Sequence, residues 1–204
     1  LSRYNNKLKI VVHNHSDWSS TQSKIKRIIM NAKDNFIYHI IGKNIKLIAV
    51  SRVIAQKINA IYIPNGLVLS RIKCYSPIEI KNLKGKYHCN RGINFLIFAW
   101  SPFVKGLDIA VNSIGILNER KYKVNLLIVC GKSNINDIKQ YINNNCKFSA
   151  ESKYLKYLPP TLDSYEYFSI SDAFISASRS EGFSYCLMEA ISIGLPSLST
   201  RVIK

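Results

Sequence analysis

Two hydrophobic patterns alternate along the chain. Short apolar runs are typical of buried strands, and the segments between them carry apolar residues every three or four positions, which is typical of helices that cover a sheet. The predicted strands are 8–12, 46–51, 61–63, 94–99, 125–130, 154–158, 172–177 and 197–203. Because strands that alternate with helices form parallel sheets, the pattern predicts an α/β protein with a doubly wound sheet.

The predicted helices are 23–43, 53–58, 107–117, 135–143 and 162–169, followed by one that Ser184 caps. The first of them is amphipathic, with Lys24, Lys26, Arg27 and Lys33 on or near its polar face. Such a helix either covers a sheet or lies on an anionic membrane surface, and the covering role is the commoner one.

Residues 67–90 have no clear hydrophobic period. Pro77, Gly85 and many Lys and Asn residues interrupt them. This composition predicts an irregular connection between two α/β units. The chain begins at Leu1 and the last predicted strand runs almost to Lys204, so we expect both ends to be cut.

The stretch 178–196 has the pattern of a tight loop, a helix and a stop, and it carries a carboxylate in each of its first two parts. Gly182 allows the turn, Glu181 lies in the loop, and Glu189 lies in the helix. From the rise of a helix, the two carboxylates are expected about 10 Å apart, which is wide for the carboxylate pair of a glycosidase. They suit the two ends of an extended polyhydroxylated ligand, with the helix N-terminus as an anion site between them. The alternative is that both are ordinary solvated charges.

Further polar residues follow the predicted strands. In parallel sheets, ligands bind at the carboxyl ends of the strands, so Lys105, Gly131 and Glu181 are expected to face one crevice. The loop His13-Asn14-His15-Ser16 follows the strand 8–12. It is either a further set of ligand contacts or a solvated turn.

The chain is strongly basic, with 29 Lys and Arg against 12 Asp and Glu and a net charge of +17. This favours anionic partners: nucleic acid, acidic lipid or a phosphorylated small molecule. The alternative is a compositional bias toward Lys spread over the whole surface. Lys strongly outnumbers Arg and no basic tail is present, which argues against dedicated reading of nucleic acid.

The cysteines and histidines predict neither disulfides nor a metal site. The five cysteines are odd in number and contain no Cys-x-x-Cys pair, which favours free thiols in a reducing cytoplasm. The four histidines add no converging ligand spacing. No apolar run reaches 18 residues, so we expect a cytoplasmic protein, either soluble or associated with the inner face of the membrane.

Several motifs occur in a recognisable order. They are Ala49-Val-Ser51, Ile63-Pro-Asn-Gly66, Lys105-Gly-Leu-Asp108, Ser171-Asp-Ala-Phe174, Ser178-Arg-Ser-Glu-Gly-Phe-Ser184, Glu189-Ala190 and Gly194-Leu-Pro196. In this order and spacing the chain resembles the retaining family-four glycosyltransferases with the two-domain GT-B fold. The hallmark of that family is two glutamates separated by seven residues, as Glu181 and Glu189 are.

The resemblance implies a division of the chain into three parts. Residues 1–66 would be the C-terminal part of an N-terminal, acceptor-side Rossmann-like domain, 67–90 a linker, and 91–204 a nucleotide-sugar donor domain that is incomplete at its C-terminus. The substrate would be a nucleotide-diphosphate sugar of the UDP or GDP type, with no separate cofactor and no metal. The acceptor would be a glycan or a lipid-linked glycan, and an anionic membrane surface is a further candidate partner.

The resemblance also implies roles for single residues. Glu189 would bind the ribose hydroxyls and Glu181 a hydroxyl of the donor sugar. Lys105 would neutralise the diphosphate as it leaves, and His15 would reach toward the sugar from the other domain, with His13 as the alternative. The remaining donor-binding positions would be Gly182, Phe183, Ser184, Gly131 and Ser101.

The chain departs from the family pattern at two places in the donor site. Trp100 and Ser101 stand near the position of an Arg that usually binds phosphate, so diphosphate binding would rest on Lys105 and backbone N–H groups, with Arg179 or Lys132 as helpers. Ser184 replaces a glycine, which limits how closely the backbone approaches a ligand.

The residues together with the resemblance predict a glycosyltransferase that moves a sugar from its nucleotide to a hydroxyl acceptor. The resemblance implies that transfer proceeds with retention, as in the synthesis of bacterial envelope or capsular polysaccharides. The first alternative is a truncated or non-catalytic module that binds nucleotide sugars. The second alternative is a basic nucleic-acid-binding protein, which the charge permits but no basic-aromatic motif supports.

Overall fold

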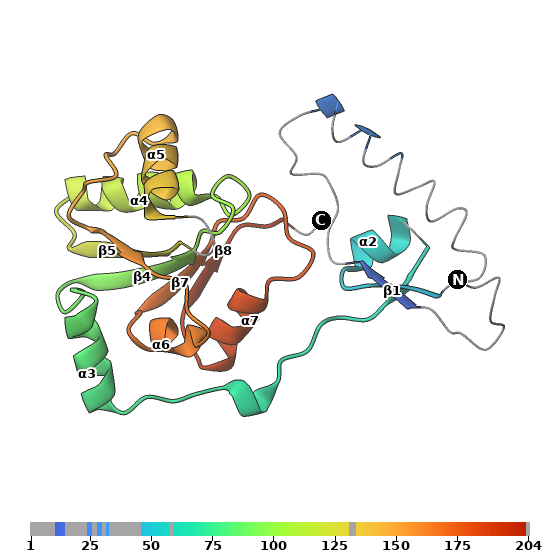
Figure 1. Cartoon of the computed structure of the whole chain (residues 1–204), viewed down its shortest axis with the longest axis horizontal. Coiled ribbons are helices and arrows are strands. Elements are labelled where there is room, and N and C mark those ends of the chain that lie inside the picture. Colours follow the sequence, from blue (N-terminus) through green and yellow to red (C-terminus); the bar gives the residue numbers. More distant parts are fainter. Residues whose placement is uncertain are drawn as a thin grey trace. The chain divides into compact units, whose positions relative to one another are not determined.

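The computed structural model describes residues 11–14, 24–25, 28–29, 32, 46–57, 59–130 and 134–202. By their contacts the residues form two compact units (Figure 1). The first unit comprises Leu1–Gly66, Ser180–Ser184 and Arg201–Lys204, and the second comprises Leu67–Arg179 and Tyr185–Thr200. Each unit is described by itself.

The second unit contains a sheet of five parallel strands in the order β6-β5-β4-β7-β8. Its strands are β4 Ile93–Phe98, β5 Val124–Val129, β6 Leu155–Leu158, β7 Ala173–Ser176 and β8 Ser197–Ser199. Its α-helices are α3 Pro77–Lys86, α4 Leu107–Glu119, α5 Ile135–Asn145, α6 Ser164–Ser169 and α7 Tyr185–Ser192. The predicted parallel α/β architecture is confirmed, although β8 ends at Ser199 and is shorter than predicted.

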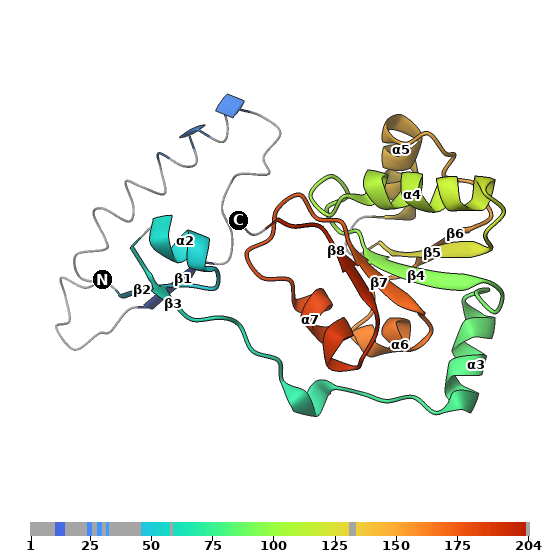
Figure 2. The ribbon, with the colours of Figure 1, turned by 180° about the vertical axis from the view of Figure 1, so that it is seen from behind.

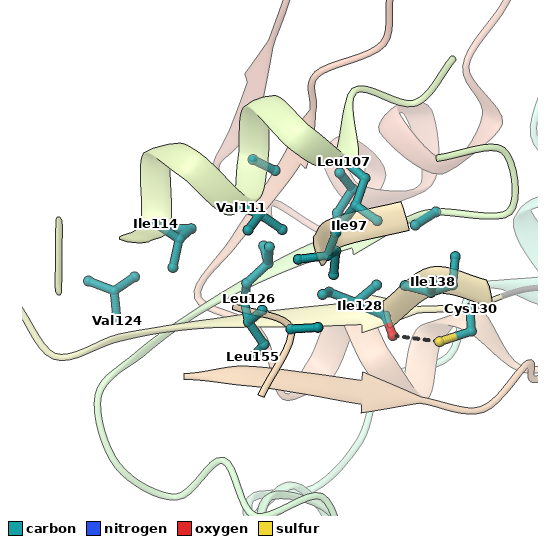
Figure 3. Packing of buried hydrophobic residues seen from close by; sticks show 14 residues of the cluster. Ile97, Leu107, Val111, Ile114, Val124, Leu126, Ile128, Cys130, Ile138 and Leu155 are labelled. Atoms are coloured by element: carbon teal, nitrogen blue, oxygen red, sulfur yellow. Dashed lines mark hydrogen bonds between the residues drawn. The ribbon is translucent and has the colours of Figure 1, made fainter. Parts of the chain in front are cut away.

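Helices cover both faces of this sheet, with α4 and α5 on one face and α3, α6 and α7 on the other (Figures 1 and 2). Side chains of a strand point alternately to opposite faces. In β5, Leu126 and Ile128 therefore pack with α4 and α5, as Figure 3 shows, whereas Leu127 and Val129 pack with α6. This double burial explains why the strands are continuous apolar runs and not alternating ones.

The segment 67–90 is more ordered than its composition predicts. It contains the 3₁₀ turn η1 Leu69–Arg71 and the ten-residue helix α3. Ser76 caps α3: its hydroxyl accepts a bond from the backbone N–H of Glu79, and the Glu79 carboxylate accepts one from the backbone N–H of Ser76. This capping box, with Pro77 in the first turn, was the sequence signal for the helix.

In the first unit, three strands form a parallel sheet in the order β1-β2-β3. They are β1 Val11–Asn14, β2 Lys46–Ala49 and β3 Ile61–Tyr62, and the helix α2 Arg52–Lys57 follows β2. The strand β1 extends to Asn14, so His13 lies in the strand and not in the loop after it, where the sequence placed it. A small core forms around Ala49, Ile54 and Ala55.

The structure describes only five positions of the predicted amphipathic helix 23–43, and all five are helical. Ile25, Ile28 and Ile29 among them are exposed. The covering role predicted for this helix therefore finds no support at these three side chains. Within the described ranges, no helix combines the length and the apolar character needed to cross a membrane.

The second unit depends on a glycine at position 106. Gly106 has a φ of 65°, and a Cβ there would lie 2.0 Å from the carbonyl oxygen of Ala177. We expect Gly106→Ala to lower the free energy of unfolding by about 3 kcal/mol or more, because it combines left-handed backbone with a clash that involves two backbones. Urea denaturation of the purified protein measures this loss.

Gly194 provides the matched control for this prediction. Its φ of 75° is similar, but nothing lies within 4 Å of an added Cβ. Gly194→Ala should cost only the strain of the left-handed backbone, about 1 kcal/mol. Equal losses in the two variants would show that the approach of Gly106 to Ala177 does not matter for stability.

Candidate functional site

The loop after β4 presents Lys105 at the carboxyl edge of the second unit's sheet. Consecutive backbone hydrogen bonds close the loop, from Lys105 N to Ser101 O at 2.9 Å and from Leu107 N to Pro102 O at 2.9 Å. The Lys105 ammonium nitrogen lies 4.6 Å from the centre of the Trp100 ring. This cation–π contact holds a positive charge beside a half-exposed aromatic surface.

The loop after β7 is tied to the loop after β4. The backbone N–H of Arg179 donates to the carbonyl oxygen of Val104 at 2.7 Å. On the other side, the hydroxyl of Thr200 donates to the carbonyl oxygen of Ser178 at 2.6 Å. Because β4 and β7 are neighbours in the sheet, the two loops that follow them share one edge.

The guanidinium of Arg179 is bound inside this edge. It makes a bidentate pair with the Asp108 carboxylate at 2.8 and 2.7 Å, and it donates to the carbonyl oxygen of Phe103 at 2.7 Å. The hydrogen bonds from Arg179 hold the pKa of Asp108 below its usual value, although burial acts in the opposite direction. These contacts do not support the expectation that Arg179 helps to bind a diphosphate.

Glu189 lies on α7 and is partly buried. Burial raises the pKa of its carboxyl group, and a hydrogen bond from the Ser164 hydroxyl at 3.3 Å offsets only part of this effect. Ser164 begins α6, which follows the carboxyl end of β6. A carboxylate that is partly desolvated and bonded to a neutral hydroxyl can accept further hydrogen bonds from ligand hydroxyls, since it has about four acceptor positions.

The structure describes the other predicted residues unevenly. Ser101 lies in the loop of Lys105, where its carbonyl oxygen accepts the Lys105 N–H. Glu181, Gly182, Phe183 and Ser184 belong to the first unit by their contacts, so their place relative to Lys105 and Glu189 stays a prediction. His15 and Gly131, as well as the suggested helper Lys132, lie outside the described residues.

Sequence reasoning assigned no role to three residues that the structure brings into this region. Asp108 holds Arg179, and the hydroxyl of Tyr141 donates to Asp108 at 3.2 Å from α5. Ser164 holds Glu189. Asp108 belongs to the motif Lys105-Gly-Leu-Asp108, but nothing in the sequence relates it to Arg179, and nothing relates Ser164 to Glu189.

Among the residues that the structure describes, no three His, Cys, Asp or Glu side chains lie together in a way that could hold a metal ion. The groups described at this edge are the ammonium of Lys105 and the carboxylate of Glu189, which can accept hydrogen bonds from hydroxyl groups. Both lie in the second unit, near the ends of parallel strands where α/β proteins bind ligands.

The family of the chain follows from its sequence over this unit. The family model for glycosyl transferases group 1 matches residues 93–204, which is more than half of the chain. The chain belongs to this family. The comparison with curated proteins found no significant match.

Solved structures share the fold. HepE of Anabaena, in complex with UDP and glucose, superposes with a TM-score of 0.75 at 18% identity, over 98% of this chain and 54% of its own. WaaG, a glycosyltransferase involved in lipopolysaccharide biosynthesis, gives 0.69 at 16% identity, over 94% and 56%. Sucrose-phosphate synthase from Thermosynechococcus elongatus gives 0.67 at 13% identity, over 98% and 52%.

The chain therefore has the parallel, Rossmann-like α/β architecture of GT-B glycosyltransferases, as the sequence predicted. It spans about half the length of these solved structures. At sequence identities of 13–18%, the similarity to these structures shows a shared fold alone.

The raised pKa of Glu189 leads to a prediction about stability. At pH 7 the ionised carboxylate is partly desolvated, so Glu189→Gln should raise the free energy of unfolding by a small amount, because the side chain is also partly exposed. Since the folded-state pKa lies above the ordinary value of 4.5, this gain should vanish below pH 4.5, where the carboxyl group is neutral in both states.

Urea denaturation of both proteins at pH 7 and at pH 4 measures the difference. Glu119→Gln is the control, because Glu119 is an exposed carboxylate at the end of α4. It should leave stability almost unchanged at both pH values. A loss of stability in Glu189→Gln at pH 7 would contradict the prediction, because it would show that the carboxylate is held by stabilising bonds.

Proposed function

We propose that this chain forms part of a retaining, metal-independent glycosyltransferase of family four, which moves a sugar from a nucleotide diphosphate to a hydroxyl acceptor. The observation that carries the proposal is the position of Lys105 and Glu189. In the unit that the family model matches, a cation and a partly desolvated carboxylate lie near the carboxyl ends of parallel strands. A diphosphate needs the first group and a ribose needs the second.

Each residue has a role in this proposal. Glu189 accepts hydrogen bonds from the ribose hydroxyls, and Lys105 neutralises the negative charge that grows on the diphosphate as the sugar leaves. Glu181 binds a hydroxyl of the donor sugar, while Gly182, Phe183 and Ser184 approach the sugar and diphosphate through their backbone. Retention rests on the resemblance to family four. The remaining proposed contacts, carried by the same resemblance, are Ser101, Gly131 and His15.

The structural relatives support a donor of the nucleotide-diphosphate type. HepE is known in complex with UDP and glucose and in complex with UDP-glucose. WaaG acts in lipopolysaccharide biosynthesis, which supports a place for the present protein in bacterial envelope or capsular polysaccharide synthesis. In that setting the acceptor is a glycan or a lipid-linked glycan, the enzyme works in the cytoplasm, and its basic surface faces the anionic inner membrane.

A second candidate function is a module that binds nucleotide sugars without transferring them. By the resemblance to family four, Trp100 and Ser101 stand near the place of a phosphate-binding Arg, and the guanidinium of Arg179 is paired with Asp108. Reduced charge beside the leaving group would slow transfer more than it weakens binding, because charge grows in the transition state.

Calorimetric titration with nucleotides tests the donor site. We expect binding of UDP or GDP and a loss of about tenfold in affinity for that nucleotide in Lys105→Ala, since a charge-assisted hydrogen bond to phosphate is removed. The affinity for the corresponding nucleoside, which has no diphosphate, should not change. Lys81→Ala is the control, because Lys81 is an exposed lysine on α3.

Two outcomes would contradict this donor site. If the unaltered protein binds no nucleoside diphosphate, the proposed function is wrong. If Lys105→Ala and Lys81→Ala weaken nucleotide and nucleoside alike, the ammonium of Lys105 is not a diphosphate ligand.

The stereochemistry of transfer separates the enzyme from the module. A full-length protein that contains this chain, given an α-linked nucleotide sugar and an acceptor, should yield an α-linked product, which the anomeric proton coupling in NMR reports. A β-linked product would contradict retention. Nucleotide-sugar binding without transfer or hydrolysis would favour the module.

A further inference from the structure

Arg179 contacts the Lys105 loop at several points. Its backbone N–H donates to Val104, its guanidinium donates to the carbonyl oxygen of Phe103, and the guanidinium carbon lies 4.5 Å from the centre of the Phe103 ring. On the other side of Lys105, the same guanidinium makes the bidentate pair with Asp108 in the first turn of α4. The contacts of Arg179 therefore flank Lys105 on both sides.

The backbone geometry reinforces this arrangement. Gly106, next to Lys105, approaches the carbonyl of Ala177 so closely that no side chain fits between them. Tyr141 on α5 adds a hydrogen bond to Asp108. The guanidinium therefore contacts the loop after β4 and the first turn of α4, and Asp108 links it to Tyr141 on the helix α5.

The pair is partly shielded from water, with 30% of the Arg179 side chain and 19% of the Asp108 side chain exposed. A bidentate guanidinium–carboxylate pair constrains orientation as well as distance, because both groups are planar and meet along two parallel hydrogen bonds. A lysine in place of the arginine would keep the charge and lose this constraint.

We propose that Arg179 and Asp108 are positioning residues for the donor diphosphate: their ion pair fixes the backbone on both sides of Lys105 and holds the ammonium ready for the phosphates. Arg179 is not itself a phosphate ligand. This proposal rests on the proposed function, since it assigns Lys105 to the diphosphate.

The opposing possibility is that Arg179 leaves Asp108 when the donor arrives and binds phosphate directly. Neutralising Asp108 separates the two. As a positioning residue Asp108 is required, so Asp108→Asn should weaken diphosphate binding. If Arg179 were a ligand that Asp108 holds back, the same change would release it and strengthen binding.

The test compares the affinities for UDP and uridine, measured by calorimetry on the full chain, in Asp108→Asn, Arg179→Lys, Arg179→Ala and Lys105→Ala. If GDP is the nucleotide bound, GDP and guanosine take their place. We expect Asp108→Asn and both Arg179 variants to bind the diphosphate about three- to tenfold more weakly. The affinity for uridine should stay the same. A general structural defect would lower the affinities for uridine and UDP together.

A double variant of Arg179 and Lys105 completes a double-mutant cycle, which tests whether the two residues act together. If Arg179 acts through Lys105, Arg179→Ala in the Lys105→Ala background should cause almost no additional loss of diphosphate affinity. Where Arg179→Ala does not fold, Arg179→Lys combined with Lys105→Ala gives the same comparison. Lys81→Ala again serves as the control on α3.

Several results would overturn the proposal. They are stronger diphosphate binding in Asp108→Asn, unchanged binding in Arg179→Lys together with a loss in Arg179→Ala, additive losses in the double variant, or equal losses for UDP and uridine. If the unaltered protein binds UDP and Lys105→Ala weakens it while Asp108→Asn and Arg179→Lys do not, the donor site stands and the positioning role fails. If no nucleotide binds at all, the proposed function fails with it.

Discussion

The close approach of two loops organises the carboxyl edge of the second unit. Because β4 and β7 are neighbours in the sheet, the loops after them meet, and Gly106 lies against the carbonyl of Ala177 with no room for a side chain. This contact brings Arg179 within reach of Asp108 and Phe103. The conformation of the Lys105 loop thus depends on a strand pairing and not on the loop residues alone.

The sheet provides a rigid support for that edge. Its central strands are covered on both faces by the helix layers seen in Figures 1 and 2, and side chains such as Leu126, Leu127 and Ile128 are fully buried. Dense packing of this kind resists deformation. Loops that leave such a sheet start from fixed points, which is why function in α/β proteins concentrates there.

The charged side chains at this edge have different surroundings, although the chain as a whole carries a net charge of +17. Arg179 is paired with Asp108, and the ammonium of Lys105 lies over the ring of Trp100. The carboxylate of Glu189 is partly desolvated, with the neutral Ser164 hydroxyl as a hydrogen-bond donor. The net charge of the chain therefore says little about the surroundings of any single charged side chain, because the fold decides which groups lie beside it.

The sequence alone determined the parallel α/β class, because continuous apolar runs such as 125–130 and the helical periods between them depend only on burial. The hydrophobic pattern and the composition did not reveal α3, whose signal in the sequence is the capping box of Ser76 and Glu79, nor that β1 extends to His13 and Asn14. Only the tertiary structure paired Arg179 with Asp108 and Ser164 with Glu189, since these residues are far apart in the chain. Hydrogen bonds of this kind depend on strand order, which no local pattern of residues encodes.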